Sequence, residues 1–136
     1  MSSLISSQTV DFLIELALKS EAPNHKVSCM TFNKRGRVLS TAYNRPFKSH
    51  PIQALYAMKV GQPERINLHA EILALIRARE PVHTIHVLRI GKKDFTPKPS
   101  FPCCICMGYI LDSGVKEIVF HDSKGVLTSK TIYENL

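Results

Sequence analysis

Two short motifs constrain this chain more than any other feature of its sequence. The first is His69-Ala70-Glu71, and the second, further along, is Pro102-Cys103-Cys104-Ile105-Cys106. Together they offer one imidazole and two thiolates, a common ligand set for zinc, with a carboxylate close to the imidazole. Three protein ligands leave the fourth tetrahedral position open, and an open position separates catalytic zinc from structural zinc. The chain is therefore expected to fold so that these two motifs meet.

The spacing of the cysteines selects two of them as ligands. Cysteine occurs at positions 29, 103, 104 and 106, and such clustering favours metal binding over disulfides. Cys103 and Cys106 are three residues apart, which places them on one face of a helical turn. Cys104 is then the spare thiol. Cys29 lies in an apolar stretch and is expected to be a small buried hydrophobe.

The pattern of apolar residues predicts one domain, 1–136, with alternating helices and strands. Helices are expected at 9–20, 52–60, 68–79 and 103–113, with a helical stub at 130–136. Strands are expected at 27–32, 38–42, 84–90, 116–121 and 126–128. The segment 91–102 is expected to be a loop that delivers Cys103, and Gly114 to cap the helix after it. This order predicts a three-layer α/β/α sandwich around a mixed sheet of about five strands.

The two motifs are expected to open helices, and this explains why their chemistry suits a metal. The positive ends of two helix dipoles would then face the site and favour thiolates. Zinc lowers the pKa of water that it binds to about 7, which supplies a nucleophile at neutral pH. Glu71, which is not needed as a ligand, would move protons between that water and the substrate. The motifs therefore indicate a metal-dependent hydrolase.

A structural zinc site or a redox pair is the alternative interpretation of the same residues. A structural site would need a fourth cysteine or histidine close to the other three. Five further histidines are candidates: His25, His50, His83, His86 and His121. None of them has a ligand spacing to either motif, and a structural site has no use for an unligated Glu71. The catalytic interpretation is therefore preferred.

An H-x-E followed by P-C-x-x-C is the signature of the zinc-dependent cytosine and adenine deaminases. Over residues 44–120 the chain resembles this cytidine deaminase-like superfamily. The resemblance implies the same sandwich fold, a zinc ion bound by His69, Cys103 and Cys106, and Glu71 as the catalytic acid and base. It also implies a homo-oligomer, because members of the superfamily often assemble in this way.

Two branches of the superfamily share features with the chain. The helix His69-Ala70-Glu71-Ile72-Leu73-Ala74-Leu75 and the segment Tyr43-Asn44-Arg45-Pro46 resemble the tRNA adenosine deaminases. The segment Ser113-Gly114-Val115-Lys116-Glu117-Ile118-Val119-Phe120 is closer to the deoxycytidylate deaminases. Leu73 departs from the latter, which usually carry asparagine there, and Asn44 precedes Arg-Pro where they have glycine.

Three functions follow, and the first is preferred. It is the deamination of a small cytosine nucleotide such as dCMP. The second is editing of a polynucleotide, either cytosine in single-stranded DNA or RNA or adenosine in tRNA. The third is a zinc-stabilised interaction module without enzymatic activity.

Six residues are candidates for contacts with the substrate. They are Asn44, Arg45, Lys48, Ala70, Phe101 and Pro102. Asn44 is expected to orient the substrate, although asparagine is also common in turns. Arg45 and Lys48 could contact a phosphate or lie on the surface, and Phe101 could stack on a base or pack in the core. Ala70 and Pro102 adjoin the ligands His69 and Cys103.

The net charge of +7 supports a substrate that carries phosphate without fixing its size. The basic residues are dispersed along the chain, so many of them are expected to form a solvated surface. No apolar run is long enough to cross a bilayer, and no membrane partner is expected. Residues 1–7 lack the basic and apolar regions of a signal peptide, which predicts a cytoplasmic location.

Overall fold

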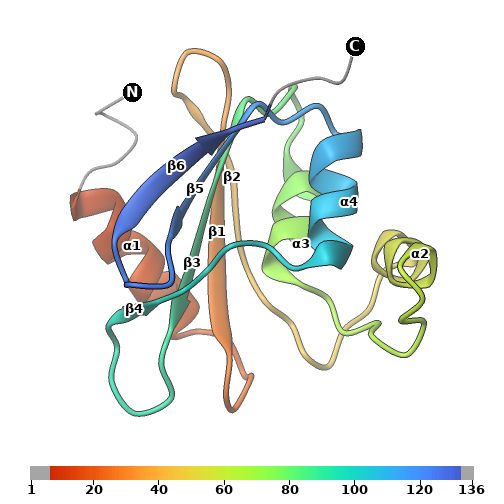
Figure 1. The fold of residues 1–136 in the computed structure, drawn as a ribbon, viewed down its shortest axis with the longest axis horizontal. Coiled ribbons are helices and arrows are strands. Elements are labelled where there is room, and N and C mark those ends of the chain that lie inside the picture. Colours follow the sequence, from red (N-terminus) through yellow and green to blue (C-terminus); the bar gives the residue numbers. More distant parts are fainter. Residues whose placement is uncertain (1–6, 133–136) are drawn as a thin grey trace.

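The computed structural model describes residues 7–132 and consists of a twisted sheet with helices on both faces (Figure 1). The elements in chain order are α1 (Ser7–Ala17), β1 (Lys26–Phe32), β2 (Val38–Tyr43), α2 (Pro51–Lys59), α3 (Ala70–Arg77), β3 (Thr84–Ile90), β4 (Pro97–Lys98), α4 (Cys104–Asp112), β5 (Glu117–His121) and β6 (Leu127–Thr131). The strand order is β2-β1-β3-β5-β6, and the short β4 pairs with β3. Only β3 and β5 run parallel, and the other pairs are antiparallel.

The helices form two layers around this sheet. Helix α1 packs against β1 and β3 on one face, and α3 packs against β1 and β2 on the other. Helix α4 lies beside α3, and α2 lies outside α4 (Figure 1). The expected three-layer α/β/α sandwich is therefore confirmed, with a mixed sheet of six strands. No helix within residues 7–132 has the length and the apolar character to cross a membrane.

Each face of the sheet has its own apolar core. The core under α3 and α4 includes Cys29, Ile105 and Ile118, all fully buried. The core under α1 includes Leu13 and Leu88. The central strands are thus buried on both faces, which explains their nearly continuous apolar sequences. Cys29 is the small buried hydrophobe that its sequence context predicts, and burial raises the pKa of its thiol.

Two expectations about the chain were wrong, both because pairing with the preceding strand of the sheet overrides local preference. The loop expected at 91–102 contains β4, which pairs with Arg89 and Ile90 of β3. The helical stub expected at 130–136 begins inside β6, because Lys130 and Thr131 pair with β5. Positions 133–136 lie outside the described residues. The cap predicted at Gly114 is confirmed by its φ of 78°, a value that favours glycine.

A buried glutamine of α2 fixes the start of α3. The side-chain oxygen of Gln53 accepts a hydrogen bond from the backbone N–H of His69 at 3.1 Å. Its amide nitrogen donates to the carbonyl of Arg65 at 3.2 Å. The segment before His69 is also held by backbone pairing, because Leu68 bonds to Arg45 and Lys48 at 2.9 Å each. The backbone at the first metal-ligand candidate is therefore held from several sides.

We predict that Gln53→Ala lowers the free energy of unfolding by about 1–3 kcal/mol, because it leaves buried backbone groups without partners. Urea denaturation measures this loss. Gln8→Ala is the matched control, since Gln8 is exposed on α1, and it should change stability by less than about 0.5 kcal/mol. Equal unfolding midpoints for the two variants would contradict this role of Gln53.

Candidate metal centre and active site

Two helix starts bring the three metal-ligand candidates together. His69 is the N-cap residue of α3, and Cys103 is the N-cap residue of α4, both with extended backbone. Cys106 lies in the first turn of α4 and is fully buried. As the sequence predicts, both motifs open helices, so the partial positive charges of two helix ends face the same point.

The spacing of the donor atoms suits a tetrahedral zinc ion. Nδ1 of His69 lies 3.2 Å from Sγ of Cys106 and 3.6 Å from Sγ of Cys103. Zinc–nitrogen and zinc–sulfur bonds of about 2.0 and 2.3 Å at tetrahedral angles place such atoms about 3.5 Å apart. All three donors lie within 4.8 Å of one another, and no other such group of histidines, cysteines and acids occurs in residues 7–132.

The protonation of the two thiols also indicates a cation site. A hydrogen bond from Cys106 is the main reason why the pKa of Cys103 falls to about 3. The same bond, together with burial, raises the pKa of the Cys106 thiol. The same hydrogen bond thus favours the thiolate of Cys103 and the protonated thiol of Cys106. Zinc ligands must be deprotonated, so a bound zinc ion would displace that proton and balance both thiolates.

The pKa of His69 is shifted in opposite directions by its surroundings. Burial lowers the pKa of His69, but its hydrogen bond with Cys103 and the negative charge of Glu71 outweigh that effect, and the pKa is raised overall. A metal ligand must instead be a neutral imidazole. The ring nitrogen that faces both sulfur atoms is Nδ1.

Glu71 lies beside these donors without belonging to the group of three. It is the second residue of α3 and only 6% exposed. Burial raises the pKa of its carboxyl, and the positive charge of His69 opposes that shift. Hydrogen bonding with Cys106 lowers the pKa of Glu71 as well. A carboxyl with raised proton affinity next to a metal site suits a group that accepts and returns protons.

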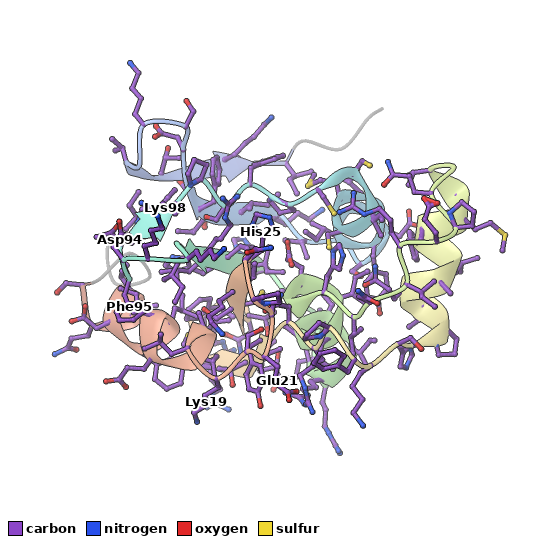
Figure 2. All side chains as sticks on the ribbon, turned by 90° about the horizontal axis from the view of Figure 1, so that it is seen from below. Lys19, Glu21, His25, Asp94, Phe95 and Lys98 are labelled. Carbon is purple, nitrogen blue, oxygen red and sulfur yellow. The ribbon has the colours of Figure 1, made fainter. Side chains whose placement is uncertain are left out.

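A cavity of about 450 Å³ opens beside His69, Glu71 and Cys103. Its volume lies in the range of small-molecule pockets. The walls come from the loop before β1, the end of β2, the end of β3 and the segment 99–103. Figure 2 views this end of the sheet, with the side chain of His25, one of the lining residues, near its middle.

Ser100 explains why this cavity forms where it does. The pairing of the parallel strands β3 and β5 ends at His86 and Val119. Beyond that point, Oγ of Ser100 donates to the carbonyl of Val87 and accepts from the N–H of His121, both at 2.9 Å. The serine thus inserts between the diverging strands and carries the chain across their carboxyl ends to Cys103. Ligand sites of α/β proteins commonly lie at this edge of the sheet.

Three of the six residues that the sequence nominates for substrate contacts line the cavity, and three do not. Asn44, Ala70 and Phe101 are among the lining residues. Arg45, Lys48 and Pro102 are not. The guanidinium of Arg45 lies 5.4 Å from the ring centroid of Tyr43, and Lys48 is exposed. Pro102 is buried between Phe101 and Cys103.

Asn44 holds the loop before β1 in place. Its side-chain oxygen accepts from the N–H of Val27 at 3.0 Å, and its side-chain nitrogen donates to the carbonyl of His25 at 2.7 Å. Its backbone carbonyl accepts from Oγ of Ser20 at 3.0 Å. One amide hydrogen and one lone pair of the side chain remain for a further partner. Asn44 therefore combines a structural role with a polar group at the cavity wall.

Phe101 presents an aromatic ring to the cavity while packing against its neighbours. The ring is 44% exposed and stands edge-on to Phe120, with centroids 5.0 Å apart. The ammonium of Lys130 lies 5.5 Å from its centroid. Phe101 therefore both lines the cavity and packs against a neighbouring ring, so its two alternative roles are compatible.

The cavity has basic residues that the sequence motifs did not indicate. Arg65, Arg89 and His25 line it, although no motif contains them. The sequence does contain one indication of Arg89, because it is an arginine within the otherwise uncharged strand β3. Arg65 and His25 lie in loops, where the sequence pattern gives no indication of what a side chain faces.

The remaining thiol and histidines stay outside the metal group. Cys104 is exposed, and Nε2 of Gln62 donates to its sulfur at 3.8 Å. None of the five other histidines joins the three donors. His50, for example, caps α2 by accepting from the N–H of Ile52 at 3.1 Å. Within the described residues, the site therefore has three ligand candidates and no fourth, as an open coordination position requires.

Comparison with known proteins agrees with this geometry. The chain is similar to a crystal structure of cytidine deaminase from Burkholderia pseudomallei, with a TM-score of 0.56 and 20% sequence identity over 89% of this chain and 91% of that one. This likeness concerns the fold. No curated protein matches the chain in sequence. The family model of the cytidine and deoxycytidylate deaminase zinc-binding region matches residues 5–122. The chain therefore belongs to this family and is a zinc-dependent deaminase.

Proposed function

We propose that the chain hydrolyses the exocyclic amine of a free cytosine nucleotide such as dCMP, giving dUMP and ammonia. The observation that carries this proposal is the cluster of three donor atoms, of which His69 and Cys103 line one cavity together with the unligated carboxyl of Glu71. In it, His69, Cys103 and Cys106 hold the zinc ion. A cavity of about 450 Å³ suits one nucleotide.

Glu71 moves the protons of the reaction. Bound zinc supplies a nucleophile from water at neutral pH. As oxygen adds to C4 of the base, Glu71 takes a proton from the attacking water and delivers it to N3. It then transfers the second water proton to the amine, the C4–N bond breaks, and ammonia leaves. A single carboxyl can serve each step because burial raises its pKa, so that it can both accept a proton and return it.

The lining residues orient the base in this proposal. Asn44 offers one free amide hydrogen and one free lone pair at the cavity wall. Ala70 is fully buried between His69 and Glu71, so its small side chain leaves room for the ring. Phe101 provides an exposed aromatic face to which a base can stack.

The distribution of surface cations supports a mononucleotide over a polynucleotide. Lys34 and Arg35 lie in the turn between β1 and β2 (Figure 1). The cavity lies at the other end of these strands, where β1 begins and β2 ends. These cations therefore cannot extend a phosphate track from the site. Of these four cations, only Lys92 and Lys93 lie at the cavity end, in the exposed loop after β3.

We predict that the zinc-loaded protein releases ammonia from dCMP, and that deamination has only weak salt dependence because one phosphate is engaged. An ammonia-release screen with dCMP, CMP, cytidine, tRNA and a single-stranded oligonucleotide measures this preference. A polynucleotide substrate would release several counterions, and its affinity would fall steeply with salt. Turnover of the oligonucleotide or tRNA without turnover of dCMP would contradict the proposed substrate.

Removal of a proposed ligand should remove the metal. We expect Cys103→Ala and Cys106→Ala to lose most bound zinc and to unfold at lower urea concentration, because metal binding is coupled to folding. Cys104→Ala is the matched control within the same motif and should keep one zinc ion per chain. Elemental analysis gives the zinc content. Full zinc retention in Cys103→Ala would overturn the ligand assignment.

Glu71→Gln should keep the fold and the zinc ion but lose nearly all turnover. Glutamine preserves the shape of the side chain and cannot accept a proton, so a general acid–base role predicts a loss of about 10²-fold or more in kcat. Glu15→Gln removes the same charge from the exposed face of α1 and should leave kcat unchanged. Near-normal kcat in Glu71→Gln with full zinc content would exclude this residue from the reaction.

A further inference from the structure

Arg89 lies in a row of cross-strand neighbours at the cavity end of the sheet. In the register of the strands, Arg89 pairs with Val27 on one side and with Lys98 on the other. Val27 in turn lies next to Asn44, with which it exchanges backbone and side-chain hydrogen bonds at 3.0 Å. Residues paired in this way face the same side of a sheet. Asn44, Val27 and Arg89 all line the cavity.

The guanidinium of Arg89 has no partner among residues 7–132. Its Nε–H is buried away from solvent, and no acceptor lies within hydrogen-bond distance of it. The two ion pairs in the described part of the chain are Lys59–Asp112 and Lys98–Asp94, so neither involves Arg89. An arginine cannot escape by losing its proton. A partly buried cation without a counter-charge is costly, and an anionic ligand would relieve that cost.

Of the other basic residues near the cavity, Arg65 and His25 line it, Lys98 is paired with an acid, and Arg45 and Lys48 lie outside it. Lys98, the neighbour of Arg89 in the row, has its ammonium 3.2 Å from Asp94, beside which it lies in Figure 2. Nη1 of Arg65 donates to the side-chain oxygen of Gln62 at 3.1 Å. Arg45 and Lys48 do not line the cavity at all. Arg89 is therefore the cation best placed to receive an anion there.

We infer that Arg89 binds the phosphate of a free nucleotide substrate and thereby selects nucleotides over nucleosides. This inference rests on the proposed deamination of a cytosine nucleotide. With the base directed to Glu71, the phosphate reaches the part of the same cavity that Arg89 lines. Guanidinium presents a planar fork of donors that matches phosphate oxygens. Glu71 is the only carboxylate among the lining residues, so little negative charge competes for Arg89.

The test compares one substrate with phosphate and one without. Measurements of kcat/KM for dCMP and deoxycytidine are made on the zinc-loaded wild type, Arg89→Gln, Arg89→Lys and Arg79→Gln. Arg79 is exposed after α3, so its variant is the matched control for net charge. Zinc content and urea unfolding are measured for each protein. Arg89→Lys retains the charge and provides the comparison if Arg89→Gln does not fold.

Arg89→Gln should lower kcat/KM for dCMP about 10- to 100-fold, through KM, because charge-assisted hydrogen bonds to phosphate are lost. Deoxycytidine turnover should stay unchanged. Arg89→Lys should lower kcat/KM for dCMP less than Arg89→Gln does. Arg79→Gln should have the kcat/KM of the wild type with both substrates. Inorganic phosphate should compete with dCMP in the wild type and compete more weakly in Arg89→Lys.

Two results would overturn the inference while the proposed reaction stands. The first is an equal loss of kcat/KM for dCMP and deoxycytidine in the Arg89 variants, which would indicate a structural role. The second is a wild-type kcat/KM for deoxycytidine as high as that for dCMP. A wild-type protein that deaminates neither compound would instead overturn the proposed function.

Discussion

The charge balance between two neighbouring thiols is the constraint on which the rest of this structure depends. Cys103 and Cys106 are held close together at the start of α4, where the hydrogen bond between them lowers the pKa of Cys103 and raises the pKa of Cys106. The start of α3 brings the imidazole of His69 to the same point. The sheet, the cap positions and the bonds of Gln53 and Ser100 all serve to hold these donors in register. A bound zinc ion then balances the negative charge of the two thiolates.

In the proposed reaction, one part of the cavity holds the reacting base and another part binds the phosphate. At one part of its wall lie His69, Cys103 and the buried carboxyl of Glu71, to which we assign the proton transfers. At another part, Arg89 offers positive charge that no residue of the described chain neutralises. A substrate with an amino-substituted ring and a phosphate satisfies both requirements at once. The same distribution explains why dispersed surface lysines are not needed for recognition in this account.

The sequence was sufficient to predict the residues that local spacing determines. His69, Cys103 and Cys106 follow from motif chemistry, and the helix starts and the cap at Gly114 follow from short-range rules. The roles of Ser100 and Arg89 depend on strands that meet only in the folded chain, so no local pattern could reveal them. The same dependence explains why β6 replaced an expected helix at Lys130. Of the cations nominated for phosphate, neither Arg45 nor Lys48 lines the cavity, although Pro46 of the same loop does.

We expect the zinc ion to be bound by three protein ligands, with one coordination position open for the reaction. X-ray absorption at the zinc edge of the purified protein tests it directly. We predict two sulfur atoms at about 2.3 Å, one imidazole nitrogen at about 2.0 Å and one further light atom. That light atom should be replaced when a competing anion such as cyanide is added. A third sulfur or a second imidazole in an unchanging four-ligand shell would mean a closed structural site and would contradict the account.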